Sequence, residues 1–185
     1  NGTSSGHVRV YAWNGTAWSQ RGTDINGESG SDLSGWATSL SNDGTVLAIS
    51  ATNNDGNGTN SGHVRAYIWT GTTWSQRGTD LNGEAEYDLF GESVSISGDG
   101  SILAIGGRNN DGNGSNSGHT RVFGWDDSAW VQISSDIDGE ASGDESGTSV
   151  ALSEDGTVIA IGAPYNDGNG NNSGHVRVYT LTDPP

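Results

Sequence analysis

The sequence contains no cysteine, no methionine and no lysine, and only 3 of its 185 residues are proline. The missing cysteines exclude disulfide bonds and thiolate chemistry, although they do not argue against secretion. No apolar run approaches the roughly 20 residues that cross a bilayer, so we expect no insertion into membranes. Neither an initiator methionine nor a signal peptide is present, and we therefore expect a mature or partial product.

Positive charge is also scarce, because 7 basic residues, all arginine, face 23 acidic ones and leave a net charge of −16. So acidic a surface repels the phosphates of nucleic acids and anionic lipids, which argues against nucleic acid as a partner. It attracts divalent cations instead. Only 30% of the residues are hydrophobic, which is typical of disorder, but the 7 tryptophans, the 31 glycines and a regular repeat indicate a folded chain.

A strict repeat runs through the whole sequence. Gly-His pairs begin at residues 6, 62, 118 and 174, each 56 after the last, and no insertion or deletion interrupts this register. The chain therefore holds three full units, approximately 1–56, 57–112 and 113–168, and a partial fourth unit, 169–185. We expect these units to form a single repeat domain.

Each unit contains four short segments with the patterns of β-strands. In the first unit they are residues 7–13, 17–22, 36–41 and 45–50, and two of the turns between them contain Asn-Gly or Asp-Gly. The last segment is nearly all apolar, so we expect it to be buried on both faces. No segment has a helical period. The sequence predicts an all-β fold of tandem four-stranded antiparallel blades, as in a β-propeller.

The whole sequence resembles a known family of such blades through several short motifs. The runs "GESVSIS", "VIAIGAP" and "SGHVRVY" are similar to the FG-GAP repeats of integrin-alpha-like β-propellers, with Phe90-Gly91 as the FG and Gly162-Ala163-Pro164 as the GAP. The chain looks still more like the repeat arrays in extracellular proteins of marine microbes and algae. Closed propellers have about four to eight blades. With three units, we expect an open array or one that a neighbouring chain completes.

A loop rich in asparagine and glycine precedes the later Gly-His pairs and matches the front of a calcium loop, D-x-[DN]-x-[DN]-G, with Asn for the first Asp. The bidentate Glu at the twelfth position is missing, and Val64 stands there. In the FG-GAP family that the sequence resembles, the calcium loop lies between the third and fourth strands, and in this sequence that connection is too short to enclose an ion. Two interpretations remain, a Ca²⁺ site and a plain turn with positive φ. The candidate ligands are Asn53, Asp55, Asn57, Asn109, Asp111, Asn113, Asp167 and Asn169.

A second acidic pattern follows each hairpin, in the first unit as Asp24-x-Asn26-Gly27-Glu28-x-x-x-Asp32. It is either a cation site, at least as good as the first loop, or a solvated connector between blades. The repeated histidines lie about a blade apart, so we interpret them as structural. We expect each repeated arginine to pair with a carboxylate of a connector. The histidines are His7, His63, His119 and His175, and the arginines are Arg9, Arg65, Arg121 and Arg177.

The Asn-Gly loops also carry acceptor sites for N-glycosylation, N-x-[ST]. A glycan on Asn57 would crowd a calcium ion in the same loop, so these two interpretations compete. We favour sugars if the host is eukaryotic. The acceptors are Asn1, Asn14, Asn57, Asn113 and Asn171.

Each hairpin places two tryptophans on either side of a tight turn. They can pack across the hairpin and hold the blade together, the interpretation that we favour, or stack against sugars as in lectin propellers. The residues are Trp13, Trp18, Trp69, Trp74, Trp125 and Trp130.

Catalytic motifs are absent from the sequence, which has no G-x-S-x-G and no H-E-x-x-H and repeats its carboxylate pairs in every unit. We therefore predict a protein that is not an enzyme, namely an extracellular or cell-surface scaffold with a structural or adhesive role. Its unpaired edge strands predict self-association into an oligomer or filament. The alternative is a carbohydrate-binding module that uses the tryptophan hairpins.

Overall fold

The computed structural model describes residues 2–181, which form β-strands and turns without any helix in that range. Accordingly, none of these residues forms a helix long and apolar enough to cross a membrane. All pairs of named strands are antiparallel. The prediction of an all-β fold is confirmed.

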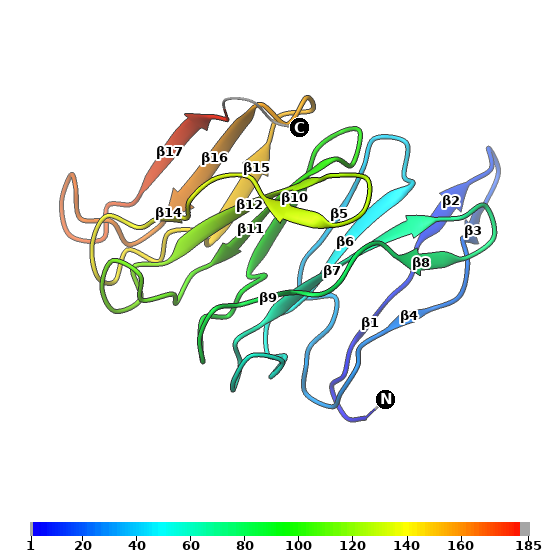
Figure 1. Cartoon of the computed structure of the whole chain (residues 1–185), viewed down its shortest axis with the longest axis horizontal. Coiled ribbons are helices and arrows are strands. Elements are labelled where there is room, and N and C mark those ends of the chain that lie inside the picture. Colours follow the sequence, from blue (N-terminus) through cyan, green and yellow to red (C-terminus); the bar gives the residue numbers. More distant parts are fainter. Residues whose placement is uncertain (1, 182–185) are drawn as a thin grey trace.

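Two complete sheets form the middle of the molecule (Figure 1). In each of them four strands follow one another in chain order, and a fifth short strand pairs with the beginning of the third. We count the N-terminal strand pairs together as the first sheet. The second sheet consists of β5 (Thr38–Leu40), β6 (Val46–Ala51), β7 (His63–Trp69), β8 (Trp74–Gln76) and β9 (Leu81–Asn82). The third sheet consists of β10 (Ser93–Ile96), β11 (Ile102–Gly107), β12 (His119–Trp125), β13 (Trp130–Gln132) and β14 (Ile137–Asp138).

Smaller sheets lie at the two ends of the array. The predicted strand over residues 7–13 is divided here, whereas its later copies are continuous. We attribute the difference to β6 and β11, which pair along those copies and have no counterpart beside the first among the described residues. The N-terminal pairs are β1 (His7–Val8) with β4 (Ile25–Asn26) and β2 (Tyr11–Trp13) with β3 (Trp18–Gln20). The fourth sheet is β15 (Ser149–Leu152), β16 (Val158–Ala163) and β17 (His175–Thr180).

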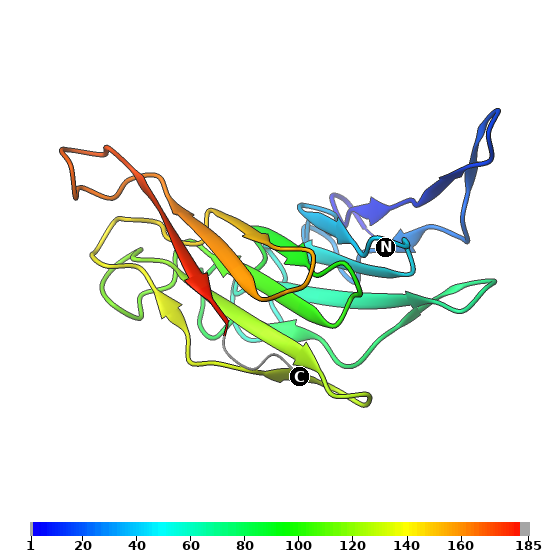
Figure 2. The same ribbon diagram turned by 90° about the horizontal axis from the view of Figure 1, so that it is seen from above.

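The second, third and fourth sheets each combine the last two strands of one sequence unit with strands from the start of the next. The second and third sheets thus run from residue 38 to 82 and from 93 to 138, out of step with the units read from the sequence. The sheets lie side by side in chain order, from the N-terminal hairpins at one end to β17 at the other (Figures 1 and 2). They form a propeller-like array that does not close.

The core lies between successive sheets, and the central strands serve two parts of it at once. All residues of β6 and β11 are buried, which confirms the prediction for the apolar segment. Along β6, Val46 packs toward the third sheet, whereas Leu47 packs toward the N-terminal hairpins. Because side chains alternate across a strand, a strand that is apolar throughout can fill both interfaces.

Backbone atoms of the FG and Gly-His motifs lie close together, just before β10 and β7. Gly62 has a positive φ of 77°, and a Cβ atom there would collide with the backbone oxygen of Phe90. Only glycine combines this conformation with so close an approach. Phe90 itself is fully buried among residues of the second and third sheets.

We predict that Phe90→Ala lowers the free energy of unfolding by about 3–5 kcal/mol, because it leaves a cavity between two sheets. Leu40→Ala removes an exposed side chain and should change it by no more than about 0.5 kcal/mol. Urea denaturation followed by circular dichroism measures both. Equal effects of the two substitutions would contradict the packing described here.

Candidate functional site

Each Asn-Gly loop is fastened to the acidic connector before it by a buried amide–carboxylate contact. Asn54 Nδ2 donates to Asp32 Oδ2 over 3.0 Å, and the same oxygen accepts from the N–H of Ser29. Asn54 Oδ1 accepts from the N–H of Gly56 and closes the turn. The last aspartate of the acidic pattern is therefore an anchor for the loop. Equivalent contacts join Asn110 to Asp88 and Asn166 to Asp144.

A second asparagine fastens the same loop to the connector that follows. Asn57 Nδ2 donates to the backbone carbonyls of Gly83 over 2.8 Å and of Glu84 over 3.0 Å. The loop thus bridges two successive connectors, a role that its turn-rich sequence did not reveal. Asn113 makes the same two contacts with Gly139 and Glu140.

The candidate calcium ligands serve as turn residues in this geometry. Asp55 supplies the only carboxylate of its loop, and its Oδ1 accepts from the N–H of Asn60 over 2.8 Å. Val64 is buried within β7. One engaged carboxylate fits poorly with Ca²⁺, which takes about six to eight oxygen ligands. Calcium binding by these loops stays a prediction. Asp111 and Asp167 make the same turn contact, and Asn53, Asn109 and Asn169 lie in the same loops.

The predicted glycan acceptors differ in what their amide nitrogens bind. An N-linked sugar replaces one Nδ2 hydrogen, so it would cost Asn57 or Asn113 one of its hydrogen bonds to the next connector. Asn14 closes an exposed turn through Oδ1 rather than through its nitrogen. Asn171 is exposed in the last loop. Asn1 lies outside the described residues.

Two tryptophan pairs hold successive sheets together, in contacts that we call tryptophan clasps. Trp69 and Trp74 face each other across β7 and β8, with ring centroids 5.4 Å apart. The guanidinium of Arg21, from the preceding hairpin, lies 4.7 Å from the Trp69 ring. Trp74 Nε1 donates to the carbonyl of Arg21 over 2.9 Å, and Gly22 packs against both rings. The second clasp repeats this arrangement with Trp125, Trp130, Arg77 and Gly78.

The first tryptophan pair differs from the other two in its exposure. Trp13 and Trp18 pack together with centroids 5.5 Å apart, yet they remain 53% and 67% exposed. Packing across the hairpin, the interpretation favoured from the sequence, is therefore present in all three pairs, and the two later pairs also contact the preceding sheet. The first pair, Trp13 and Trp18, is the one whose exposed rings offer flat faces for sugar stacking.

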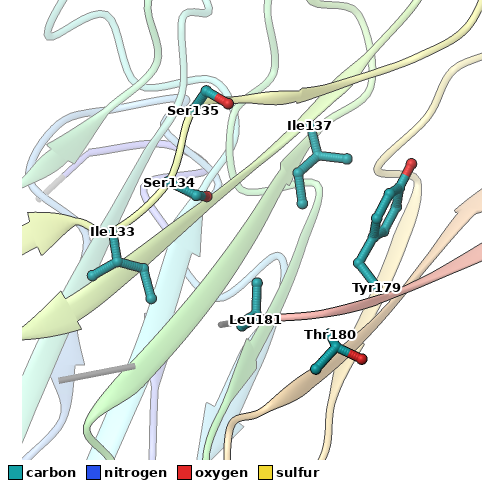
Figure 3. Close-up of a pocket in the computed structure, with 7 residues that line it drawn as sticks. All are labelled: Ile133, Ser134, Ser135, Ile137, Tyr179, Thr180 and Leu181. Atoms are coloured by element: carbon teal, nitrogen blue, oxygen red, sulfur yellow. The ribbon is translucent and has the colours of Figure 1, made fainter. Parts of the chain in front are cut away.

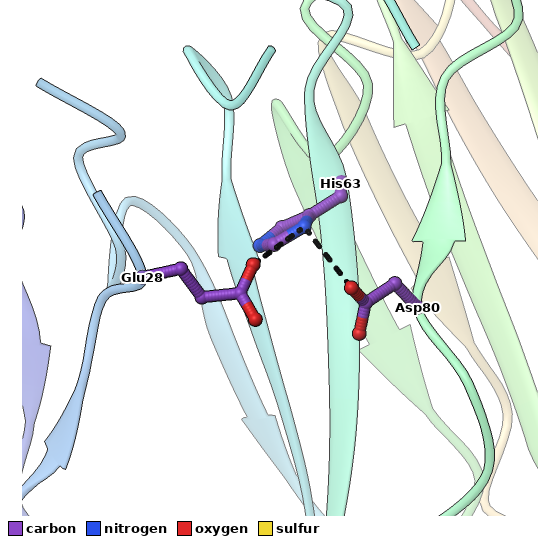
Figure 4. A group of neighbouring side chains, drawn as sticks. All are labelled: Glu28, His63 and Asp80. Atoms are coloured by element: carbon purple, nitrogen blue, oxygen red, sulfur yellow. Dashed lines mark ion pairs between the residues drawn. The ribbon is translucent and has the colours of Figure 1, made fainter. Parts of the chain in front are cut away.

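A further recurring contact, the junction cluster, joins a histidine and an arginine to carboxylates of two successive connectors. His63 Nδ1 lies 3.8 Å from Glu28 Oε2 and 4.0 Å from Asp80 Oδ2 (Figure 4). Arg65 Nη1 lies 3.3 Å from the other Glu28 oxygen, Oε1. The predicted pairing of arginine with a connector carboxylate is confirmed.

The junction cluster recurs along the array. At the next junction, His119 Nδ1 lies 3.8 Å from Glu84 Oε2 and 3.6 Å from Asp136 Oδ2. Arg121 approaches the other oxygens of both carboxylates. In the last copy, Glu140 contacts His175 and Arg177, and in the first, Arg9 pairs with Asp24 inside its own sheet.

Burial and neighbouring charged groups shift the pKa of several of these side chains. It lowers the pKa of both His63 and His119, so their rings are neutral at pH 7. Burial, together with the charge of Asp136, raises the pKa of Glu84. The bonds from Arg9 hold the exposed Asp24 at a pKa of about 2. A neutral ring nitrogen between two carboxylates is a potential metal ligand, and one ligand atom from each of Glu28, His63 and Asp80 lies within 4.8 Å of the others, as in the next copy.

The sequence had not predicted that histidines and the second acidic pattern meet. The short strand β9 brings them together, because its pairing with β7 sets His63 opposite Asn82, which closely follows Asp80. The constant period of the repeat was the available signal, but only the strand register shows which carboxylates reach which ring.

A pocket of about 240 Å³ lies at the last junction (Figure 3). Ile133 and Leu181 stand there at the positions of Arg77 and Trp125 in the preceding clasp, and both pack against the same apolar cluster. An aliphatic contact thus replaces a cation–aromatic one. The lining residues are Ile133, Ser134, Ser135, Ile137, Tyr179, Thr180 and Leu181.

Comparison with known proteins supports the fold and the repeat. No curated protein matches the sequence. A similar solved structure is a protein of Bacteroides uniformis assigned provisionally as a 6-phosphogluconolactonase, with a TM-score of 0.65 and 10% identity over 97% of this chain and 46% of that one. Another is a periplasmic gluconolactonase of Pseudomonas aeruginosa, with a TM-score of 0.57 and 18% identity over 93% and 45%. The chain spans less than half the length of either.

The family model of the FG-GAP repeat matches twice, over residues 81–123 and 135–179. Both ranges include a central apolar strand and the Gly-His strand after it, the elements on which the resemblance in sequence depended. The chain therefore contains two FG-GAP repeats, within an open, propeller-like array of sheets.

Proposed function

We propose that the chain is an extracellular or cell-surface scaffold with a structural or adhesive role. The observation that carries this proposal is that the recurring polar groups connect successive sheets. Loops and junction contacts do so at each of the three boundaries between the described sheets, and tryptophan clasps do so at two of them. Enzymes gather their reacting groups at one place. Repetition at every junction instead suits an element that lengthens by adding sheets.

The names of the two structural neighbours point toward enzymes of similar fold. Their identities of 10% and 18% carry the likeness of fold and no activity. The absence of enzymatic activity in this chain stays a prediction, supported by the repetition of its polar groups.

Self-association through β17 is part of the proposal. Among residues 2–181 this strand pairs with β16 alone, whereas the equivalent strand β12 also pairs with β13 and β14. Val176 and Val178 are 66% and 64% exposed on it. An edge strand with apolar side chains is a template for a strand of another chain. Such pairing would build an oligomer or a filament.

Glycans enter the proposal in two ways. Attached sugars at the exposed asparagines would suit an extracellular location. As an alternative function, the protein binds carbohydrate through Trp13 and Trp18, an idea favoured by the exposure of these rings.

We predict that Val176→Lys combined with Val178→Lys weakens self-association at least about tenfold, because charge on an edge opposes pairing. Sedimentation velocity over a series of concentrations measures the effect. Tyr165→Lys, at an exposed loop residue, is the control and should leave association unchanged. If the double variant associates like the parent protein, β17 is not the contact.

We predict unequal occupancy of the glycan acceptors in protein secreted from a eukaryotic host. Asn14 and Asn171 should carry sugars more often than Asn57 and Asn113, since the latter pair would lose a hydrogen bond. Glycopeptide mass spectrometry measures occupancy, and Thr16→Ala, which destroys the Asn14 acceptor, controls the assignment. Equal occupancy of all four would show that the loop contacts do not oppose modification.

We predict that Trp130→Ala lowers the free energy of unfolding by about 3–5 kcal/mol, because this ring is buried in a clasp. Trp18→Ala should change it by about 0.5 kcal/mol or less. Urea denaturation gives both values, and similar losses would contradict the clasp. On a glycan array, binding that Trp18→Ala abolishes would favour the carbohydrate-binding alternative.

A further inference from the structure

The two complete junction clusters bring together the same three potential metal ligands from three separate segments. The glutamate belongs to the connector of one sheet, the histidine begins the third strand of the next sheet, and the aspartate precedes that sheet's short last strand. The side chains converge on the space beside the ring (Figure 4). The two sets are Glu28, His63 and Asp80, and Glu84, His119 and Asp136.

His119 has buried polar atoms without partners beside this space. Its side chain is completely buried, and neither ring nitrogen has a hydrogen-bond partner. Nδ1 nevertheless points to two carboxylate oxygens, at 3.8 Å and 3.6 Å. These distances exceed a hydrogen bond, and a buried polar atom without a partner is costly. An additional atom between the three groups could bond to Nδ1 and to one oxygen of each carboxylate.

The arginine of each cluster does not contact the carboxylate oxygens that face the histidine. Arg121 Nε approaches Glu84 Oε1 at 3.9 Å and Asp136 Oδ1 at 3.8 Å, whereas His119 faces Oε2 and Oδ2. The same division holds at Glu28, whose Oε1 contacts Arg65 and whose Oε2 faces His63. A guanidinium on the outer oxygens holds the carboxylates in place, as outer-shell partners of metal ligands do.

We propose that each complete junction cluster binds one divalent transition-metal ion of the zinc class, which joins two successive sheets. Zinc bonds to imidazole nitrogen and carboxylate oxygen measure about 2.0–2.2 Å, and in a tetrahedron they place ligand atoms roughly 3.4 Å apart. The observed nitrogen-to-oxygen separations of 3.6–4.0 Å require a contraction of a few tenths of an ångström, and all three ligand atoms of each cluster lie within 4.8 Å of one another. Water can complete the coordination.

The ligand set distinguishes this ion from calcium or magnesium. Both of these prefer oxygen ligands, and each cluster offers one nitrogen with two carboxylates. These sites are separate from the Asn-Gly loops considered for calcium.

Titration of zinc into the metal-free chain of 185 residues tests the proposal by calorimetry. Two ions should bind per chain, and zinc should raise the melting temperature. Glu84→Gln should abolish one site and Glu28→Gln the other. Both glutamates are nearly half exposed, so these variants are expected to fold, and circular dichroism without metal verifies it. His119→Gln should remove the same site as Glu84→Gln.

His175→Gln is the matched control. Its ring lies 3.6 Å from Glu140, but the position that would repeat Asp136 in the next unit falls after Pro185, outside the chain tested. This variant should keep two sites. Cobalt as a probe should give visible absorption bands that weaken by half in His119→Gln.

Three outcomes would overturn the proposal. They are no zinc binding to the parent chain, zinc binding whose stoichiometry Glu84→Gln and His119→Gln leave unchanged, and equal competition by calcium. The scaffold proposal does not depend on the metal, because association through β17 is measured separately.

Discussion

Burial of apolar surface between successive sheets is the interaction on which the remaining structure depends. A sheet of four short strands has little interior of its own, and hydrophobic residues make up only 30% of the chain. The central strands meet this shortage by facing two neighbours, so that Val46 and Leu47 belong to different clusters although they are adjacent. Each sheet is therefore stable only as part of a stack.

Polar contacts then fix how the sheets are placed on one another. The tryptophan clasps, the bridging loops and the junction clusters all act across the same boundaries as the apolar clusters. They specify distance and orientation, which apolar packing alone leaves adjustable. Carboxylates of successive connectors repel one another, and arginines such as Arg65 and Arg121 lie beside these carboxylates.

The sequence was sufficient to predict what depends on period and pattern. The repeat, the strands, the buried segment at β6 and the pairing of arginine with connector carboxylates follow from alternation, turns and charge. It did not show that a sheet combines two units, because strand order depends on which edges meet in space. The convergence of His119 with Glu84 and Asp136 was missed for the same reason, since these three residues are distant in sequence and meet only when β12 pairs with β14.

The last junction, where Ile133 and Leu181 stand in place of a clasp, limits how such a chain can change its number of repeats. Arg21 and Arg77 are matched by Trp69 and Trp125, whereas Ile133 is matched by Leu181. Unequal crossing-over between the repeats of the gene would pair an isoleucine with a tryptophan, or an arginine with a leucine, across a boundary between sheets. The new boundary would lose its cation–aromatic contact. Repeats that look interchangeable in sequence therefore carry a fixed order, and arrays of this kind are expected to grow or shrink by blocks that keep both partners of a boundary together.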